Sequence, residues 1–82
     1  NFSGRYPAVV INHVDRLGII SHITSILAIN QINIATVVNS RDSTGKKAVT
    51  MIETETPVDE SVKKELESMS AVESVVTMEK VS

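Results

Sequence analysis

The sequence predicts an α+β domain of the ferredoxin-like type: a βαββαβ plait with a four-stranded antiparallel sheet and two helices on one face. Two segments, 19–30 and 60–69, carry apolar residues at the helical spacings of three and four. Four other segments are rich in β-branched residues, and the order is strand, helix, strand, strand, helix, strand. Right-handed crossovers fold two such halves into one plait.

The first half begins with a strand at 8–11, a run of apolar residues that is hydrophobic on both faces and is therefore expected in the middle of the sheet. A helix follows from Ile19 to Asn30, a residue type that tolerates the left-handed position after a helix. The next strand is predicted at 32–41. Simple alternation puts Ile32, Ile34 and Val38 on one of its faces and Ala35 and Val37 on the other.

In the second half, residues 42–46 have the composition of a hairpin turn, and 47–55 form the returning strand. Pro57 ends the sheet and Asp59 is placed to cap the second helix. The last strand is predicted at 72–81.

Composition limits the function. The 82 residues suffice for one domain, and a net charge of -2 gives no electrostatic reason to expect nucleic acid or an anionic membrane as a partner. No cysteine is present, and no apolar run is long enough to span a bilayer. The chain starts with Asn1, so we expect a piece of a longer cytoplasmic protein, with a lead-in at 1–6 and a domain at 7–82.

The turn between the first strand and the first helix is the candidate ligand site. Polar residues gather there just before Gly18, and the helix begins at once. The free amides of a first helical turn bind anions, and a glycine lets a ligand approach the backbone. The amides of Gly18 and Ile19 are expected to hold a carboxylate, with Asp15 and Asn33 available for an ammonium group.

Other functions of this plait need residues that are missing. Base stacking requires aromatic side chains on the sheet, yet Phe2 and Tyr6 are the only aromatics and both precede the first strand. A heavy-metal site of the usual kind requires paired cysteines. Arg16 has no glycine-rich cradle around it, which disfavours an acyl-phosphate hydrolase.

Structural alternatives remain open for the same residues. His13 can be a hydrogen-bonded structural histidine, and Asp15 can cap the first helix. His22 is expected to be solvated, and Glu53 and Glu55 are interpreted as ordinary surface carboxylates. The two histidines, with no cysteine nearby, disfavour a metal site.

The run from Asp15 to Ile20, the helix ending near Asn30 and the segment 32–35 together resemble the signature of the ACT domain, an amino-acid-sensing module of metabolic enzymes. The resemblance covers residues 7–81. Leu17 departs from it, because a proline is common at that place.

The lead-in at 1–7, followed by the strand and His13, is similar to the segment that enters the ACT domain of iron–sulfur-dependent L-serine dehydratase, as beta subunit or fused form. The resemblance implies L-serine as ligand, with His13, Asp15 and Asn33 as contacts. The complete set of expected ligand-binding residues is Asn12, His13, Asp15, Leu17, Gly18, Ile19, Asn33 and Ile34. It also implies a homodimer joined through sheet edges, a catalytic domain or subunit as partner, and a possible 4Fe–4S cluster in the parent enzyme but no cofactor in this segment.

Two alternatives stay open beside this hypothesis. The regulatory domain of D-3-phosphoglycerate dehydrogenase is also similar, and a dimerisation module without a ligand would show the same fold. A catalytic role for the segment is disfavoured because no pair of nucleophile and base can be assembled.

Overall fold

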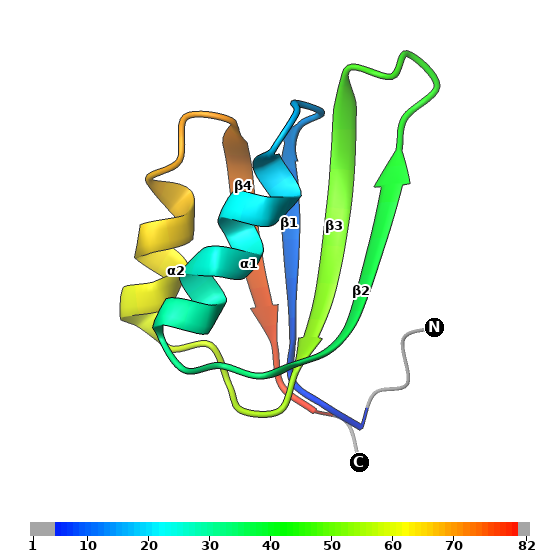
Figure 1. The fold of residues 1–82 in the computed structure, drawn as a ribbon. Helices are drawn as coiled ribbons and strands as arrows, with labels where there is room; N and C mark the ends of the chain where they lie inside the picture. The colour runs from blue at the N-terminus through cyan, green and yellow to red at the C-terminus, as the bar shows by residue number, and fades with distance from the viewer. Residues whose placement is uncertain (1–4, 81–82) are drawn as a thin grey trace.

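The computed structural model describes residues 5–80. Its elements are β1 (Ala8–Val14), α1 (Ile19–Ile29), β2 (Ile34–Arg41), β3 (Lys47–Thr54), α2 (Glu60–Glu67) and β4 (Val72–Met78) (Figure 1). The predicted βαββαβ plait is confirmed. The first residues of the predicted lead-in, 1–4, and the predicted end of the last strand at Val81 lie outside the described residues.

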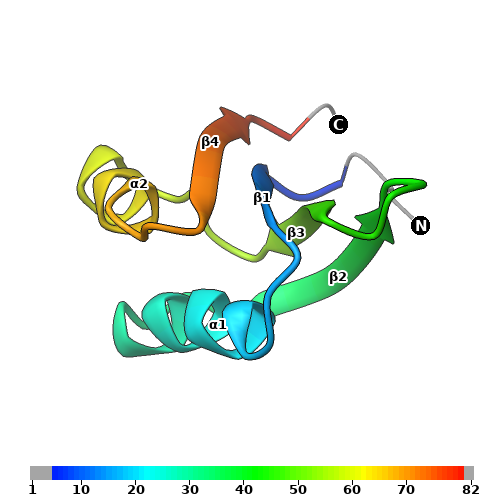
Figure 2. The same cartoon turned by 90° about the horizontal axis from the view of Figure 1, so that it is seen from above.

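The strands are ordered β2-β3-β1-β4, and all neighbours are antiparallel. β1 is therefore central, as its unbroken apolar run predicts. Both helices lie on the same face of the twisted sheet (Figure 2). At one edge of the sheet, β2 extends beyond α1. The other face of the sheet carries no helix.

The core forms between the two helices and the face of the sheet that they cover. Val9, Ile11 and Ile52 of the sheet are completely buried against Ile23 and Leu27 of α1. α2 adds its own apolar stripe. Other buried members of the core are Ile19, Ile26, Ile32, Val62, Leu66, Ala71 and Val75.

A β-bulge at Ala35 changes which face each later β2 residue occupies. Ile34 pairs with Thr54 and Thr36 pairs with Glu53, so Ala35 is an extra residue on β2. Directly opposed residues share a face, and Val37 lies opposite the buried Ile52. Ile34 and Val37 therefore both face the helices while Val38 does not. The predicted grouping of Ile34 with Val38 is wrong because strict alternation ignores the bulge.

The ends of α1 also differ from expectation. Its N-cap is Gly18, with φ 83°, and no side chain caps the helix, so the capping alternative for Asp15 is wrong. At the other end Asn30 has φ -87°, and the left-handed residue is Gln31 at φ 61°. The Asn30 side chain instead donates to the Ile26 carbonyl at 2.7 Å, which satisfies a carbonyl at the helix end.

The second half follows the prediction closely. Asp59 caps α2 by accepting a hydrogen bond from the Val62 amide at 2.9 Å. One surface assignment is wrong: Glu53 is only 2% exposed, because it lies in the sheet between Ala8 and Thr36. Glu55, beyond the end of β3, is exposed as expected.

Candidate functional site

The loop between β1 and α1 is held at its start by two backbone hydrogen bonds. The Val14 amide donates to Ala71 and the Asp15 amide donates to Lys46, each at 2.8 Å. These bonds attach the loop to the starts of β4 and β3. The backbone position at which the chain leaves β1 and enters the loop is therefore fixed.

The first turn of α1 leaves backbone donors available. The first helical bond runs from the His22 amide to the Gly18 carbonyl at 3.0 Å. The Ile19 amide, one of the two predicted ligand donors, already donates to Arg16 at 3.2 Å. The amides of Ile20 and Ser21 precede the regular helical ladder, so geometry makes them the stronger anion donors. The Gly18 and Ile19 amides as ligand donors stay a prediction.

A hollow of about 160 Å³ opens beside this turn. The predicted residues Leu17, Gly18 and Ile19 line it, together with His22. Its other wall comes from the connection between α2 and β4, Met69 to Ala71. At roughly 30 Å³ per water molecule, the hollow has room for a ligand of a few heavy atoms.

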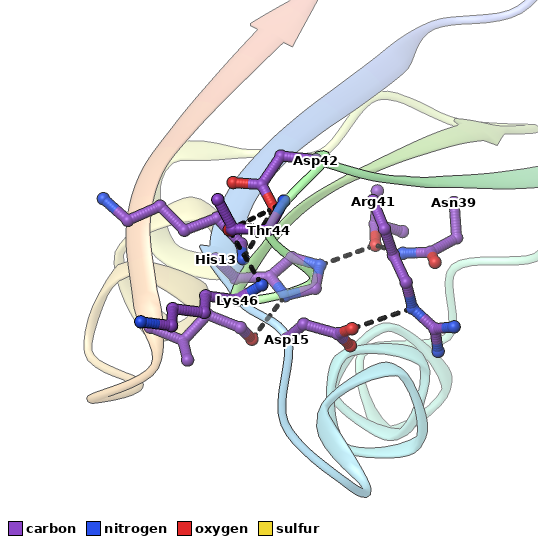
Figure 3. A network of polar contacts seen from close by, with 10 residues as sticks. His13, Asp15, Asn39, Arg41, Asp42, Thr44 and Lys46 are labelled. Atoms are coloured by element: carbon purple, nitrogen blue, oxygen red, sulfur yellow. Dashed lines mark hydrogen bonds and ion pairs between the residues drawn. The ribbon is translucent and has the colours of Figure 1, made fainter.

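A second group of polar side chains lies on the helix-bearing face of the sheet, at the end where β1 stops. We call it the polar corner; it consists of His13, Asp15, Asn39, Arg41 and Thr50, from β1, the loop after it, β2 and β3 (Figure 3). Its four strand residues share a face because Asn39 lies opposite Thr50, and Arg41 and His13 both lie opposite Ala48.

His13 is 1% exposed, and both of its ring nitrogens have protein partners. Nδ1 lies 2.9 Å from the Val14 carbonyl oxygen and Nε2 lies 2.7 Å from the Thr50 hydroxyl. A carbonyl only accepts, so Nδ1 carries the proton and the neutral Nε2 accepts from Thr50. Thr50 in turn accepts from the Asn39 side-chain amide at 2.9 Å. Every bond in this chain has one donor and one acceptor when His13 is neutral.

Asp15 forms an ion pair with Arg41. Its Oδ2 lies 2.8 Å from Arg41 Nε, and the two side chains are 22% and 67% exposed (Figure 3). Asp15 is the last residue before the loop turns toward α1, and Arg41 is the last residue of β2. The pair thus connects the loop to the edge strand across the end of β3.

A family model described as the ACT domain matches residues 8–71 of this chain. The chain is an ACT domain. ACT domains are regulatory modules that commonly bind small ligands such as amino acids. The match includes the loop, the first helix and the whole polar corner.

The structure is also similar to the crystal structure of the ACT domain from GTP pyrophosphokinase of Chlorobium tepidum. The TM-score is 0.70 at 16% sequence identity, over 88% of this chain and 95% of that one. At this identity the likeness concerns the fold alone. Comparison with curated proteins gives no significant match.

The predicted residues of this ACT domain fall into separate places within one chain. Asn33 and Ile34 lie at the start of β2, where the Asn33 side chain donates to Glu55 at 3.3 Å. β2 has eight residues, so roughly 25 Å separates Asn33 from Arg41 along the strand. Asn33 therefore does not reach the loop of its own chain.

Asn12 lies on the face of the sheet without helices, where its side chain donates to the Ser74 hydroxyl at 2.9 Å. It lines a different hollow, of about 210 Å³, with residues of β2, β3 and β4. A larger hollow, about 500 Å³, lies at the opposite end of β1 between Pro7, Glu55 and Lys80. None of the predicted site residues lines that hollow.

Three residues of the polar corner, Asn39, Arg41 and Thr50, were not predicted. Asn39 and Arg41 are polar residues two apart near the end of a predicted strand, which places them on one face. That signal does not say which face, because the bulge decides it. Within residues 5–80, no helix is long and apolar enough to cross a membrane.

Proposed function

We propose that this ACT domain senses free L-serine and regulates an iron–sulfur-dependent L-serine dehydratase, the enzyme that converts serine to pyruvate and ammonia. The observation that carries the proposal is the hollow at the start of α1, lined by Leu17, Gly18 and Ile19. Asp15, with its acidic side chain on Arg41, belongs to the same loop. The site therefore has donors and an acceptor within one short loop.

The chemistry of the loop suits a zwitterion. The unpaired amides of the first turn and the positive end of the helix favour a carboxylate. Gly18 has no side chain, and even an added Cβ would meet no atom within 4 Å, so a ligand can approach the backbone closely. Asp15 supplies the negative charge for an ammonium group.

The proposed dimer joins two copies of β2 edge to edge. β2 is an edge strand without charge before Arg41, and Val37 and Val38 at its middle are 41% and 38% exposed. Such an edge offers free backbone groups to another strand. A homodimer with two-fold symmetry brings the same edge together twice.

This dimer explains how Asn33 and Ile34 reach the site. In an antiparallel pair centred between Val37 and Val38, the partner subunit's Ile34 lies opposite Arg41. The partner subunit's Asn33 then lies beside the polar corner, although within one chain it is remote. Contacts from both subunits make ligand affinity depend on dimer geometry, which is the coupling that regulation requires.

The choice of parent enzyme depends on the lead-in at 1–7, which is similar to that of the dehydratase family. The proposed protein is cytoplasmic, with a lead-in at 1–6, the ACT domain at 7–82 and any 4Fe–4S cluster in its catalytic part. His13 as a direct contact stays a prediction, because its ring must release Thr50 or Val14 to touch a ligand. The regulatory domain of D-3-phosphoglycerate dehydrogenase is the alternative parent.

Calorimetric titration of the chain with L-serine, D-serine, glycine and the other common amino acids tests the proposal. We expect saturable heat with L-serine and at least 10-fold weaker binding of D-serine. Tighter binding of another amino acid would overturn the choice of serine, and silence from all of them would overturn sensing. Gly18→Asn keeps the left-handed backbone but fills the approach, so it should weaken serine binding without unfolding the domain.

A dimerisation module that binds no ligand is the second candidate. Leu17 is fully exposed at the tip of the loop, where an apolar side chain suits contact with another protein surface better than contact with serine. If this candidate is right, Leu17→Ser will weaken the dimer in sedimentation experiments while no amino acid produces heat.

A further inference from the structure

The Asp15–Arg41 ion pair is incompletely formed. Only Nε of the guanidinium meets the carboxylate, and only through Oδ2. Arginine presents Nε and Nη side by side, and a carboxylate that is bound bidentately uses both. Among the contacts of residues 5–80, the Nη atoms of Arg41 form no further ion pair. Both partners therefore keep binding capacity.

The location of the pair distinguishes it from ordinary surface charges. Asp15 is 22% exposed and its backbone is held by Lys46, so its carboxylate has less freedom to move than an ordinary surface side chain. Arg41 is 67% exposed at the end of an edge strand, so its side chain can move. One restrained anion and one mobile cation thus lie next to the start of α1 (Figure 3).

We infer that Asp15 and Arg41 open to admit an α-amino acid between them, with the ligand ammonium on Asp15 and the ligand carboxylate on Arg41. This inference rests on the proposed function, and it adds Arg41 as a ligand-binding residue. An α-amino acid carries both charges on one carbon, so it replaces each partner of the pair with an equivalent charge. The exchange leaves no charge unpaired.

The energetic balance favours this exchange. The Arg41 side chain is 67% exposed, so water screens its attraction to Asp15 and solvates the guanidinium when the pair opens. Charge-assisted hydrogen bonds to a ligand are stronger, and Arg41 can make two of them to one carboxylate. The first-turn amides of α1 then supplement Arg41 at the carboxylate instead of carrying it alone.

The exchange also gives the ligand a route to the sheet edge. Arg41 is the last residue of β2, and its Cα lies opposite Ala48 in the ladder. A ligand that turns the Arg41 side chain therefore acts on the strand that we propose as the dimer edge. No second conformational element is required for the signal.

The test compares ligands that lack one charge. Calorimetry would measure L-serine, L-serinamide, which lacks the carboxylate, and N-acetyl-L-serine, which lacks the ammonium. In the original chain both analogues should bind roughly 10- to 100-fold more weakly than serine. Arg41→Gln should lower serine affinity by a similar factor and leave serinamide affinity within twofold. Asp15→Asn should likewise lower serine affinity by a similar factor and leave the affinity for N-acetyl-L-serine within twofold.

Lys47→Gln is the matched control. Lys47 is 61% exposed and begins β3 at the same end of the sheet, but it pairs at 3.0 Å with Glu73 of β4, on the far side of β1. Its loss should change serine affinity less than twofold. If serine binds and Arg41→Gln keeps the full preference for serine over serinamide, the inference is wrong while the proposed function stands. If the original chain binds no amino acid, both are wrong.

Discussion

The Thr50 hydroxyl donates to Nε2 of His13 at 2.7 Å and accepts from Asn39 at 2.9 Å. Three neighbouring strands, β2, β3 and β1, therefore contribute one side chain each to a single chain of hydrogen bonds. Because His13 ends the chain at the Val14 carbonyl, the order of donors is determined. This order predicts the proton position on a buried ring.

The neutral His13 ring should carry its proton on Nδ1. Long-range proton–nitrogen NMR correlations at neutral pH distinguish the two tautomers, and we expect the pattern of a protonated Nδ1 and a bare Nε2. His22, exposed on α1, serves as the internal reference because nothing fixes its tautomer to the same extent. A protonated Nε2 in neutral His13 would contradict the hydrogen-bond order.

Thr50→Val should destabilise the domain by about 1–3 kcal/mol, because it removes the donor to His13 and the acceptor for Asn39 while keeping the shape. Urea unfolding followed by circular dichroism gives the free energy. Thr50→Ser retains the hydroxyl and is the matched control, with a smaller loss from the missing methyl group. Equal losses in the two variants would show that the hydroxyl contributes nothing.

Gly18 and Gln31 should respond to substitution in opposite directions. Gly18→Ala places a Cβ at φ 83° and should cost about 1 kcal/mol through backbone strain, although the site has room for the methyl group. Gln31→Gly relieves the same strain at φ 61° and should stabilise the domain by roughly 0.5–1 kcal/mol. Thermal unfolding of both variants measures the difference, and a change of the same sign in both would refute this explanation.

Asp42 should make the hairpin between β2 and β3 sensitive to acid. The hydroxyl of Thr44, which donates at 2.8 Å, and then backbone amides of the turn lower the pKa of Asp42 below 3.8. A lowered pKa stabilises the folded state above the unfolded value, and this contribution is lost as pH falls through the folded pKa. The original chain should therefore exceed Asp42→Asn in stability at pH 7, and the gap should shrink below about pH 3.8. A gap that is constant down to pH 2 would exclude the carboxylate as its source.

Val37→Lys should abolish the proposed dimer, since a charge in the middle of an edge strand disfavours strand pairing. Sedimentation equilibrium over a concentration series reports the mass. Val76→Lys, at a comparably exposed valine of β4, is the control and should leave the dimer intact. Loss of the dimer with both variants, or with neither, would exclude β2 as the specific contact.

The fold was predictable because its local signals agree with one another. The continuous apolar run at 8–11 indicated a central strand, Asp59 indicated the start of α2, and both are confirmed. The details that failed depend on pairing between strands. No local pattern marks Ala35 as a bulge, and burial of Glu53 follows from its neighbours in the sheet and not from its own segment.

The candidate site was predictable only in part, for the same reason. The loop residues Leu17, Gly18 and Ile19 line one hollow, as their closeness in sequence suggests. Arg41 and Asn39 join His13 and Asp15 only through the registers of three strands. Register is a long-range property, so a reading of neighbouring residues does not reach it.

The extra residue at Ala35 shifts the phase of side-chain alternation between the two parts of β2. The early part can bury Ile34 against the core, and the later part can still turn Asn39 and Arg41 toward the helices. Without the bulge at Ala35, strict alternation would put Ile34 on the opposite face of the strand from Asn39 and Arg41. The protein would then keep either its anchoring isoleucine or its arginine on the helix side, and not both.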